Sequence, residues 1–225
     1  YIMIFSTVGF MFGTGGSAVV AKTMGEGDRK KANNYFSLFV YVSFILGVLF
    51  AVLGIATVRP VAVLLGAEGE LLEDAVQYSR IILFVLPFNT LQFLFQPFFS
   101  TAEKPQLGLV TTISSGVMNI VLDAVLVLLL PQEFKLAGAA IATAMSQVVG
   151  GVIPLIYFGR RNNSILRIGK AKFDGRIIIK ALTNGSSEFM TNVSMSVVGM
   201  LYNVQLMEYA GENGVVAYGV MMYVS

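Results

Sequence analysis

Residues 36–58 read FSLFVYVSFILGVLFAVLGIATV, and no charged side chain interrupts this run. About 20 apolar residues in a helix can cross the hydrocarbon core of a bilayer, because each residue rises about 1.5 Å and the core is roughly 30 Å thick. Residues 46–53 do not alternate between apolar and polar side chains, as a membrane β-barrel strand does. The stretch is therefore predicted to be a transmembrane helix.

The same pattern recurs along the whole chain. Hydrophobic residues make up 56% of the sequence and charged residues 12%, about half the charged share of an average soluble domain. The alternative is a large soluble helical bundle, but these segments are apolar all round rather than along one stripe. We therefore predict an all-α, polytopic membrane protein with six full transmembrane helices and the start of a seventh. The runs with at most one charged residue are 1–21, 36–58, 81–102, 105–132, 136–159, 181–206 and 213–225.

The composition also excludes several kinds of chemistry. The sequence has no His, Cys or Trp, which excludes disulfides, thiol catalysis and zinc sites built from His or Cys. Hydrolase and nucleotide-binding motifs are absent, so we expect neither an enzyme nor a cofactor. A net charge of +2 gives no indication of a nucleic-acid partner.

The basic residues predict the orientation in the membrane. Of the 15 Lys and Arg residues, twelve fall in alternate connections between the apolar runs, and the other three fall in the connections between those. The positive-inside rule places the rich connections in the cytoplasm. The acidic residues on the opposite side fit an outer surface; they are Glu68, Glu70, Glu73 and Asp74.

Local signals predict where helices begin and how the chain is divided. Asp28 and Asp174 are suited to cap the helices that follow them, and Pro105 is suited to be the first residue of a helix. The longest polar connection, residues 160–175, is predicted to link residues 1–159 to the start of a second half at 176–225. The chain opens and closes inside apolar runs, so we expect a fragment of a longer protein.

A cluster of small residues marks the first helix. Gly9 and Gly13 have the spacing of close helix packing, and Gly15 and Gly16 follow directly. Residues 13–18 also match G-x-G-x-x-A, but no strand precedes them, so this is not a dinucleotide site. We expect all four glycines to pack helices, the alternative being that they unwind or bend this one.

Two acids lie inside apolar runs. Asp123 is about 16 residues into its helix, and Glu188 is about 11 residues beyond Ile177, near the middle of the next span. A charged carboxylate at that depth costs a few kcal/mol, and the apolar runs contain no Lys or Arg. Each acid is therefore protonated, holds a cation or faces a wet cavity. The alternative is a structural hydrogen-bonding role, for which Asp123 has Asn119 one turn before it.

Polar side chains accompany Glu188 at helical spacings of three and four, so they share a face. A polar face at membrane depth must point at protein or water, and we favour the wall of a cavity over interhelical hydrogen bonding. The residues of this face are Asn184, Ser187, Glu188, Thr191 and Asn192.

The run 81–102 contains a third candidate for a binding position, Gln92. It shares a helix face with Gln96. Pro87 and Pro97 predict kinks in the same helix.

Four motifs together resemble the MATE family of multidrug and toxin extrusion transporters, closest to the bacterial branch that exports cationic drugs. Each motif alone is weak, but their order and their sides of the membrane agree with the family. The motifs are GTGGS at 13–17 with AKTMGEGD at 21–28, NIVLD at 119–123, LAGAAIAT at 136–143, and residues 203–218 with GENGVVAY.

The resemblance implies a twelve-helix, two-lobe transporter, of which this chain would hold the second to seventh helices and part of the eighth. Residues 160–175 would be the loop between the lobes. Asp123 would lie in the N-lobe cavity and Glu188 in the C-lobe cavity. Family members exchange organic cations for H⁺ or Na⁺; no firm metal site is implied, although Na⁺ is a candidate at Glu188.

We therefore hypothesise a secondary antiporter of lipophilic cations in the bacterial cytoplasmic membrane. Its partners would be membrane lipid, the organic cations and the remainder of the same polypeptide. One alternative is a flippase for lipid-linked oligosaccharides or polysaccharides, whose anionic substrates would need Arg and Lys in the helices. A second alternative is a membrane scaffold that transports nothing.

Overall fold

The protein is all-α, as the sequence predicts. A computed structural model describes residues 2–64, 69–131, 134–160 and 163–224, and these residues contain helices and connections but no strand. The helices are α1 (Ile2–Gly25), α2 (Arg29–Leu64), α3 (Gly69–Phe84), α4 (Leu86–Thr101), α5 (Pro105–Leu129), α6 (Lys135–Gly159) and α7 (Gly175–Val224).

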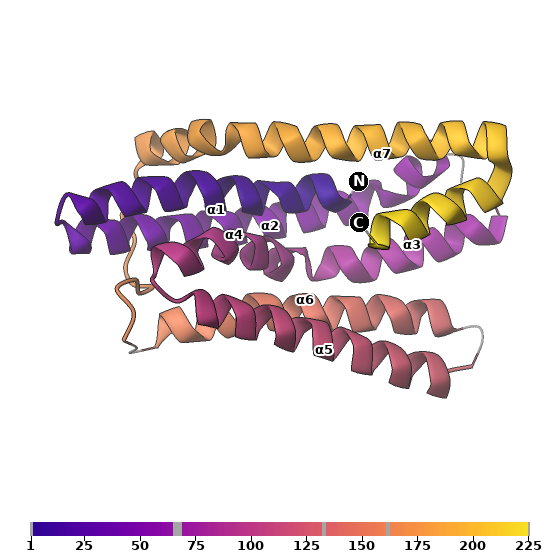
Figure 1. The fold of residues 1–225 in the computed structure, drawn as a ribbon, viewed down its shortest axis with the longest axis horizontal. Helices are drawn as coiled ribbons and strands as arrows, with labels where there is room; N and C mark the ends of the chain where they lie inside the picture. The colour runs from indigo at the N-terminus through magenta and orange to yellow at the C-terminus, as the bar shows by residue number, and fades with distance from the viewer. Residues whose placement is uncertain (1, 65–68, 132–133, 161–162, 225) are drawn as a thin grey trace.

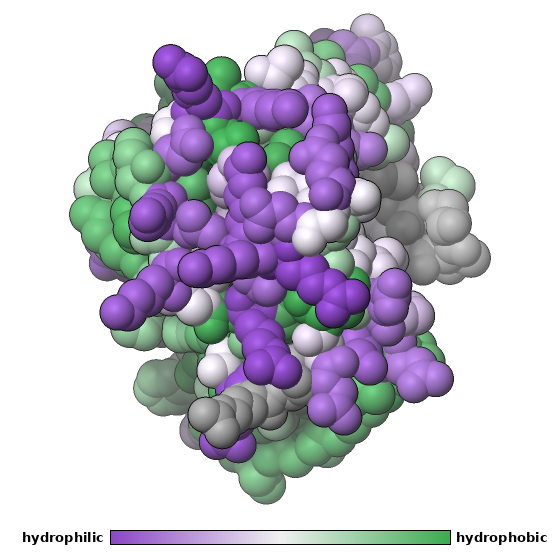
Figure 2. Space-filling view, turned by 90° about the vertical axis from the view of Figure 1, so that its left-hand side faces the viewer, coloured by the Kyte–Doolittle hydropathy of each residue, from purple (hydrophilic) through white to green (hydrophobic). Residues whose placement is uncertain are grey.

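The helices form a bundle along one long axis (Figure 1). Helix α7 lies on one side, the α5–α6 pair lies on the other, and α1, α2 and α4 lie between them. The end where α1 finishes and α2 begins is covered by hydrophilic side chains (Figure 2). We call it the basic end. It carries Lys22, Lys30, Lys31, Lys104, Lys170, Lys172 and Arg176, as the alternating connections predict.

Among the described residues, α2, α5 and α6 are long and apolar enough to cross a membrane. Helices α3 and α4, taken together as one bent span, also are. Helix α7 contains the polar face described above, which lowers its hydropathy. The six predicted spans correspond to α1, α2, the bent pair, α5, α6 and α7 as far as Gly211.

The break between α3 and α4 comes from proline. The two helices meet at an angle of 56°, with Val85 between them and Pro87 in the first turn of α4. Proline has no N–H to donate to the preceding turn and clashes with it, so the α3 ladder cannot continue. The predicted kink at Pro87 is confirmed, whereas α4 continues through Pro97 to Thr101.

Helices α2 and α3 extend well beyond the uncharged runs. Helix α2 continues past Arg59 to Leu64, and the acidic residues Glu70, Glu73 and Asp74 lie in the first turns of α3 rather than in a loop. The Arg59 guanidinium donates to the Glu73 carboxylate at 2.6 Å, which joins the two helices. Glu68 lies outside the described residues.

Helix α7 reverses direction at Gly211. This residue has φ 62° and ψ −163°, a conformation that glycine adopts without a Cβ clash. The segment after it folds back along the bundle (Figure 1), and the Tyr202 and Tyr218 rings stack with centroids 5.6 Å apart. The reversal falls between the predicted apolar runs 181–206 and 213–225.

Glycines set the distance between helices around α1. A Cβ on Gly13 would lie 2.8 Å from the Leu94 carbonyl oxygen of α4, and one on Gly16 would lie 2.8 Å from the Phe39 ring of α2. A Cβ on Gly9 would overlap the Thr90 carbonyl oxygen, and one on Gly15 would overlap that of Ala181 in α7. All four glycines therefore lie where another helix approaches closely, because a missing side chain lets the backbones approach.

The connection between α6 and α7 is an ordered strap rather than a loose linker; we use "strap" for residues 163–174. Leu166 is fully buried in the core at the basic end. The Arg167 N–H donates to Asn33 Oδ1 at 2.7 Å, and the Lys172 N–H donates to Asn34 Oδ1 at 2.6 Å. The first turns of α2 thus hold the strap along its length.

Asn33→Ala is expected to release the middle of the strap. Asn33 also donates to the Ile165 carbonyl oxygen at 3.4 Å, so the change removes the two side-chain bonds that Asn33 makes to the strap, each contributing about 1 kcal/mol. We expect amide hydrogen exchange in residues 165–169 to become roughly thirtyfold faster. Lys172→Gln, which keeps its backbone N–H, is the control; equal acceleration in both variants would contradict this role of Asn33.

Candidate functional site

The polar face of α7 is accessible in the described part of the chain. Helix α7 packs on α1 through its Gly185 side, whereas Asn184, Ser187, Glu188 and Thr191 are exposed. Asn192 is half-buried and donates from its amide to the Glu188 backbone oxygen at 2.8 Å. The Glu188 carboxylate is therefore left available to a ligand, with hydroxyl and amide groups on either side of it along the helix.

Asp123 lies on the other side of the bundle, on α5. Ser115, two turns earlier, donates to the Ser146 carbonyl oxygen of α6 at 2.7 Å. Asn119 and Asp123 follow Ser115 at four-residue steps, so they border the α5–α6 contact, and both are half-buried. No hydrogen bond joins these two side chains in the described structure, which leaves the carboxylate available.

The structure does not bring the two acids together. Helices α5 and α7 lie on opposite sides of the layer formed by α1, α2 and α4 (Figure 1). Within the described residues, the ion pairs involve Glu26 and Glu73 but neither Asp123 nor Glu188. These two sites are therefore separate centres of negative charge in the membrane region, each without a basic partner from this part of the chain.

Gln92 is half-buried, and its side chain packs between α4 and α6. A Cβ on Gly150 of α6 would lie 2.5 Å from the Gln92 Cδ atom, so the amide packs directly on that helix. The Gln92 Oε1 atom is buried and accepts no hydrogen bond from the described residues, and the same is true of Asn89 Oδ1 and Gln147 Oε1.

Three amide oxygens thus lack a donor inside apolar helices, a costly arrangement unless water or a ligand reaches them. Gln147, one turn before Gly150, faces α4 with it. Gln147 was not among the residues predicted from the sequence, although its amide stands out in the uncharged run 136–159.

Two clefts of about 600 Å³ each open at the basic end. One lies between α2 and the strap, and the other lies beside Lys104 and Arg160. Neither is lined by Asp123, Glu188 or Gln92. Groups of three or more acidic side chains that could hold a metal ion do not occur among the residues that the structure describes.

Known proteins of the same fold are transporters. A multidrug resistance MATE family transporter in an outward-facing conformation superposes with a TM-score of 0.86 at 23% identity, over 99% of this chain and 49% of that chain. A MOP superfamily transporter from Pyrococcus furiosus gives a TM-score of 0.85 at 23% identity, again over 99% of this chain and 49% of that chain.

Curated relatives are bacterial multidrug export proteins. MepA of Staphylococcus haemolyticus is 30% identical over 94% of this chain and 46% of its own length. MepA of Staphylococcus saprophyticus is 29% identical over 95% of this chain and 47% of its own length. The chain spans about half the length of these relatives. The MatE family model matches residues 1–125. With more than half of its residues matched by that model, this chain belongs to the MatE family of membrane transporters.

Proposed function

We propose that the protein exports lipophilic organic cations in exchange for H⁺ or Na⁺. It would act in the bacterial cytoplasmic membrane, with the basic end in the cytoplasm. The observation that carries this proposal is the pair of carboxylates, Asp123 and Glu188, that lie within membrane helices and have no basic partner in the described structure. A fixed negative charge in an apolar region attracts a cation or a proton.

The relatives support export as the direction of transport, and the acidic residues support a positively charged substrate. The MepA proteins are multidrug export proteins. One transporter of the same fold, from Pyrococcus furiosus, has a binding pocket of reverse polarity, for which a different function is suggested. The fold alone therefore does not determine the substrate charge, and it is the acids of this chain that favour a cation.

A shared carboxylate supplies a simple coupling mechanism. If Glu188 binds either the organic cation or the coupling ion, the two occupancies exclude each other, and each crosses the membrane in a different state of the transporter. The hydroxyl and amide oxygens of Ser187, Thr191 and Asn192 supply further oxygen ligands of the kind that a hard cation such as Na⁺ prefers. The remainder of the polypeptide would close the cavity over this face.

A flippase for acidic lipid-linked sugars fits the residues less well. Such a substrate carries pyrophosphate or carboxylate groups, which Arg and Lys recognise. The uncharged runs of this chain contain neither. A scaffold without transport activity leaves the acids at membrane depth unexplained, since each costs free energy to insert.

Glu188→Gln tests the proposal in the intact protein reconstituted into proteoliposomes. Uptake of a fluorescent organic cation is followed under an imposed H⁺ or Na⁺ gradient. We expect gradient-driven uptake in the wild type and loss of it in Glu188→Gln, because the amide cannot exchange a proton or neutralise a cation. The gradient that drives uptake identifies the coupling ion.

Glu208→Gln is the matched control, since Glu208 is an exposed acid on the same helix near the far end. It removes the same charge and should leave uptake unchanged. Uptake that survives Glu188→Gln would make Glu188 structural and move the coupling to Asp123. A wild type that transports no organic cation would contradict the proposal and favour the flippase.

A further inference from the structure

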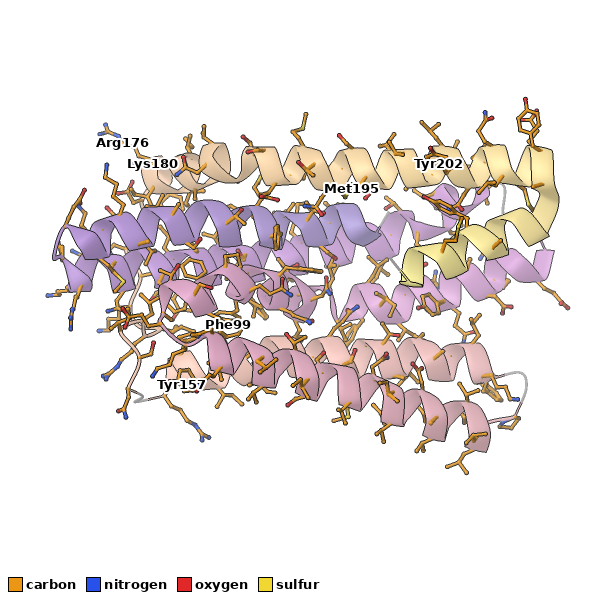
Figure 3. All side chains as sticks on the ribbon, viewed as in Figure 1. Phe99, Tyr157, Arg176, Lys180, Met195 and Tyr202 are labelled. Atoms are coloured by element: carbon orange, nitrogen blue, oxygen red, sulfur yellow. The ribbon has the colours of Figure 1, made fainter. Side chains whose placement is uncertain are left out.

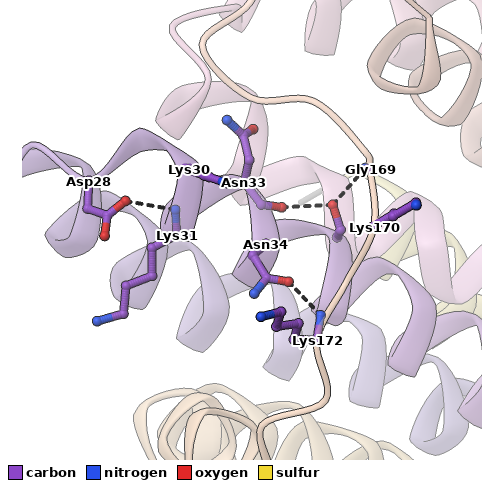
Figure 4. Close-up of a pocket in the computed structure, with 9 residues that line it drawn as sticks. Asp28, Lys30, Lys31, Asn33, Asn34, Gly169, Lys170 and Lys172 are labelled. Atoms are coloured by element: carbon purple, nitrogen blue, oxygen red, sulfur yellow. Dashed lines mark hydrogen bonds between the residues drawn. The ribbon is translucent and has the colours of Figure 1, made fainter.

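The cleft between α2 and the strap concentrates positive charge at the basic end (Figure 4). Four lysines line it, Lys30 and Lys31 from α2 and Lys170 and Lys172 from the strap. Among the described residues, no carboxylate lies within the 4.0 Å of an ion pair with any of these ammonium groups. The cleft therefore carries charge that the protein does not neutralise itself.

One acidic residue also lines the cleft, but its carboxylate is hydrogen-bonded to the backbone. The Asp28 Oδ1 atom accepts the backbone N–H of Lys31 at 3.0 Å and so caps α2. The strap's own donors are also used, because the Gly169 N–H donates to Ser37 Oγ at 2.9 Å and the Lys172 N–H donates to Asn34. The attraction for an anion thus comes from four lysine side chains against one carboxylate.

An apolar stripe continues from the cleft along the same face of α2. Tyr41 lies at the border, where its hydroxyl donates to the Gly169 carbonyl oxygen at 3.0 Å. Beyond it, exposed apolar side chains recur at steps of three and four residues, which keeps them on one face. They are Phe44, Ile45, Val48 and Val52, with Ile45 65% exposed.

We propose that this cleft and stripe bind an anionic phospholipid, with the phosphate among the four lysines and an acyl chain along α2. Charge complementarity selects an anionic headgroup. The apolar stripe contacts an acyl chain, which a soluble phosphate compound lacks. Tyrosine is enriched at this depth of membrane proteins, between the acyl chains and the headgroups. Because the strap forms one wall, the lipid would fasten it to α2, and this inference does not depend on the transported substrate.

Native mass spectrometry of the intact protein, titrated with dioleoylphosphatidylglycerol or dioleoylphosphatidylcholine, tests the site. We expect the anionic lipid to be retained and the zwitterionic lipid to be retained much more weakly. Lys31→Gln with Lys172→Gln should weaken retention of the anionic lipid by about thirtyfold. Both side chains are exposed, and Lys30→Gln with Lys170→Gln is the second pair should the first fail to fold.

Arg176→Gln with Lys180→Gln is the matched control. Both residues are exposed at the basic end of α7 and outside the cleft (Figure 3), so the net charge lost is the same. Equal loss in both double variants would show general attraction to a basic surface and would overturn the site. Displacement of the lipid by millimolar inorganic phosphate would also overturn it, since it would show a site for a soluble phosphate compound.

Discussion

Gly185→Leu is expected to separate α7 from α1 and to destabilise the protein strongly. A Cβ at Gly185 would overlap the Met11 carbonyl oxygen, a backbone atom that cannot rotate away. Within the described residues, α7 has its extensive contact with α1 alone. Overpacking usually costs 1–3 kcal/mol, and we expect about 3 kcal/mol or more here. Thermal unfolding of the intact protein in detergent, followed by circular dichroism, measures it.

Gly199→Leu is the control on the same helix. No atom lies within 4 Å of a Cβ built at Gly199, so this substitution adds the same side chain without a clash. We expect its unfolding temperature to match that of the wild type. Equal losses in the two variants would mean that the effect comes from glycine's backbone freedom and not from the α1–α7 contact.

Phe158→Ala is expected to cost about 3–5 kcal/mol, the usual range for emptying the space of a buried phenylalanine. Phe158 is fully buried near the end of α6. Its ring centroid lies 5.2 Å from that of Phe36 on α2 and 5.7 Å from that of Phe95 on α4. The ring thus joins three helices at the basic end, and its loss would leave a cavity that rigid helices cannot close.

Phe173→Ala provides the comparison for the same chemical change. Phe173 is 82% exposed in the strap, so we expect a change within about 0.5 kcal/mol. Both variants are measured by thermal unfolding under the conditions used for Gly185→Leu. A Phe158→Ala protein as stable as Phe173→Ala would show that the aromatic cluster does not stabilise the bundle.

The local features of the fold were predictable because they depend on neighbouring residues. Asp28 caps α2 and Asp174 caps α7, where the Arg176 N–H donates to its Oδ1 atom at 3.1 Å. Helix α5 begins at Pro105 as expected. Caps and proline starts need only a few adjacent residues, so the sequence contains all the information they require.

The candidate site was predictable in part. An acid inside an apolar run is visible in the sequence, and so is the polar face around Glu188. Where such a face points depends on which helix packs against it, and Gly185 turns the opposite side of α7 toward α1. Gln92 shows the limit of the pattern, because its amide is buried against Gly150 of α6, far along the chain.

The sequence by itself determined the membrane helices, their order and the basic end, since hydropathy, charge and caps act locally along the chain. The tertiary structure alone decided three things: the path of the strap over Asn33 and Asn34, the lysine cleft that this path creates, and the opposite placement of Asp123 and Glu188. The physical reason is that each depends on contacts between residues distant in sequence. Such contacts are set by the shapes of packed surfaces, which no local pattern records.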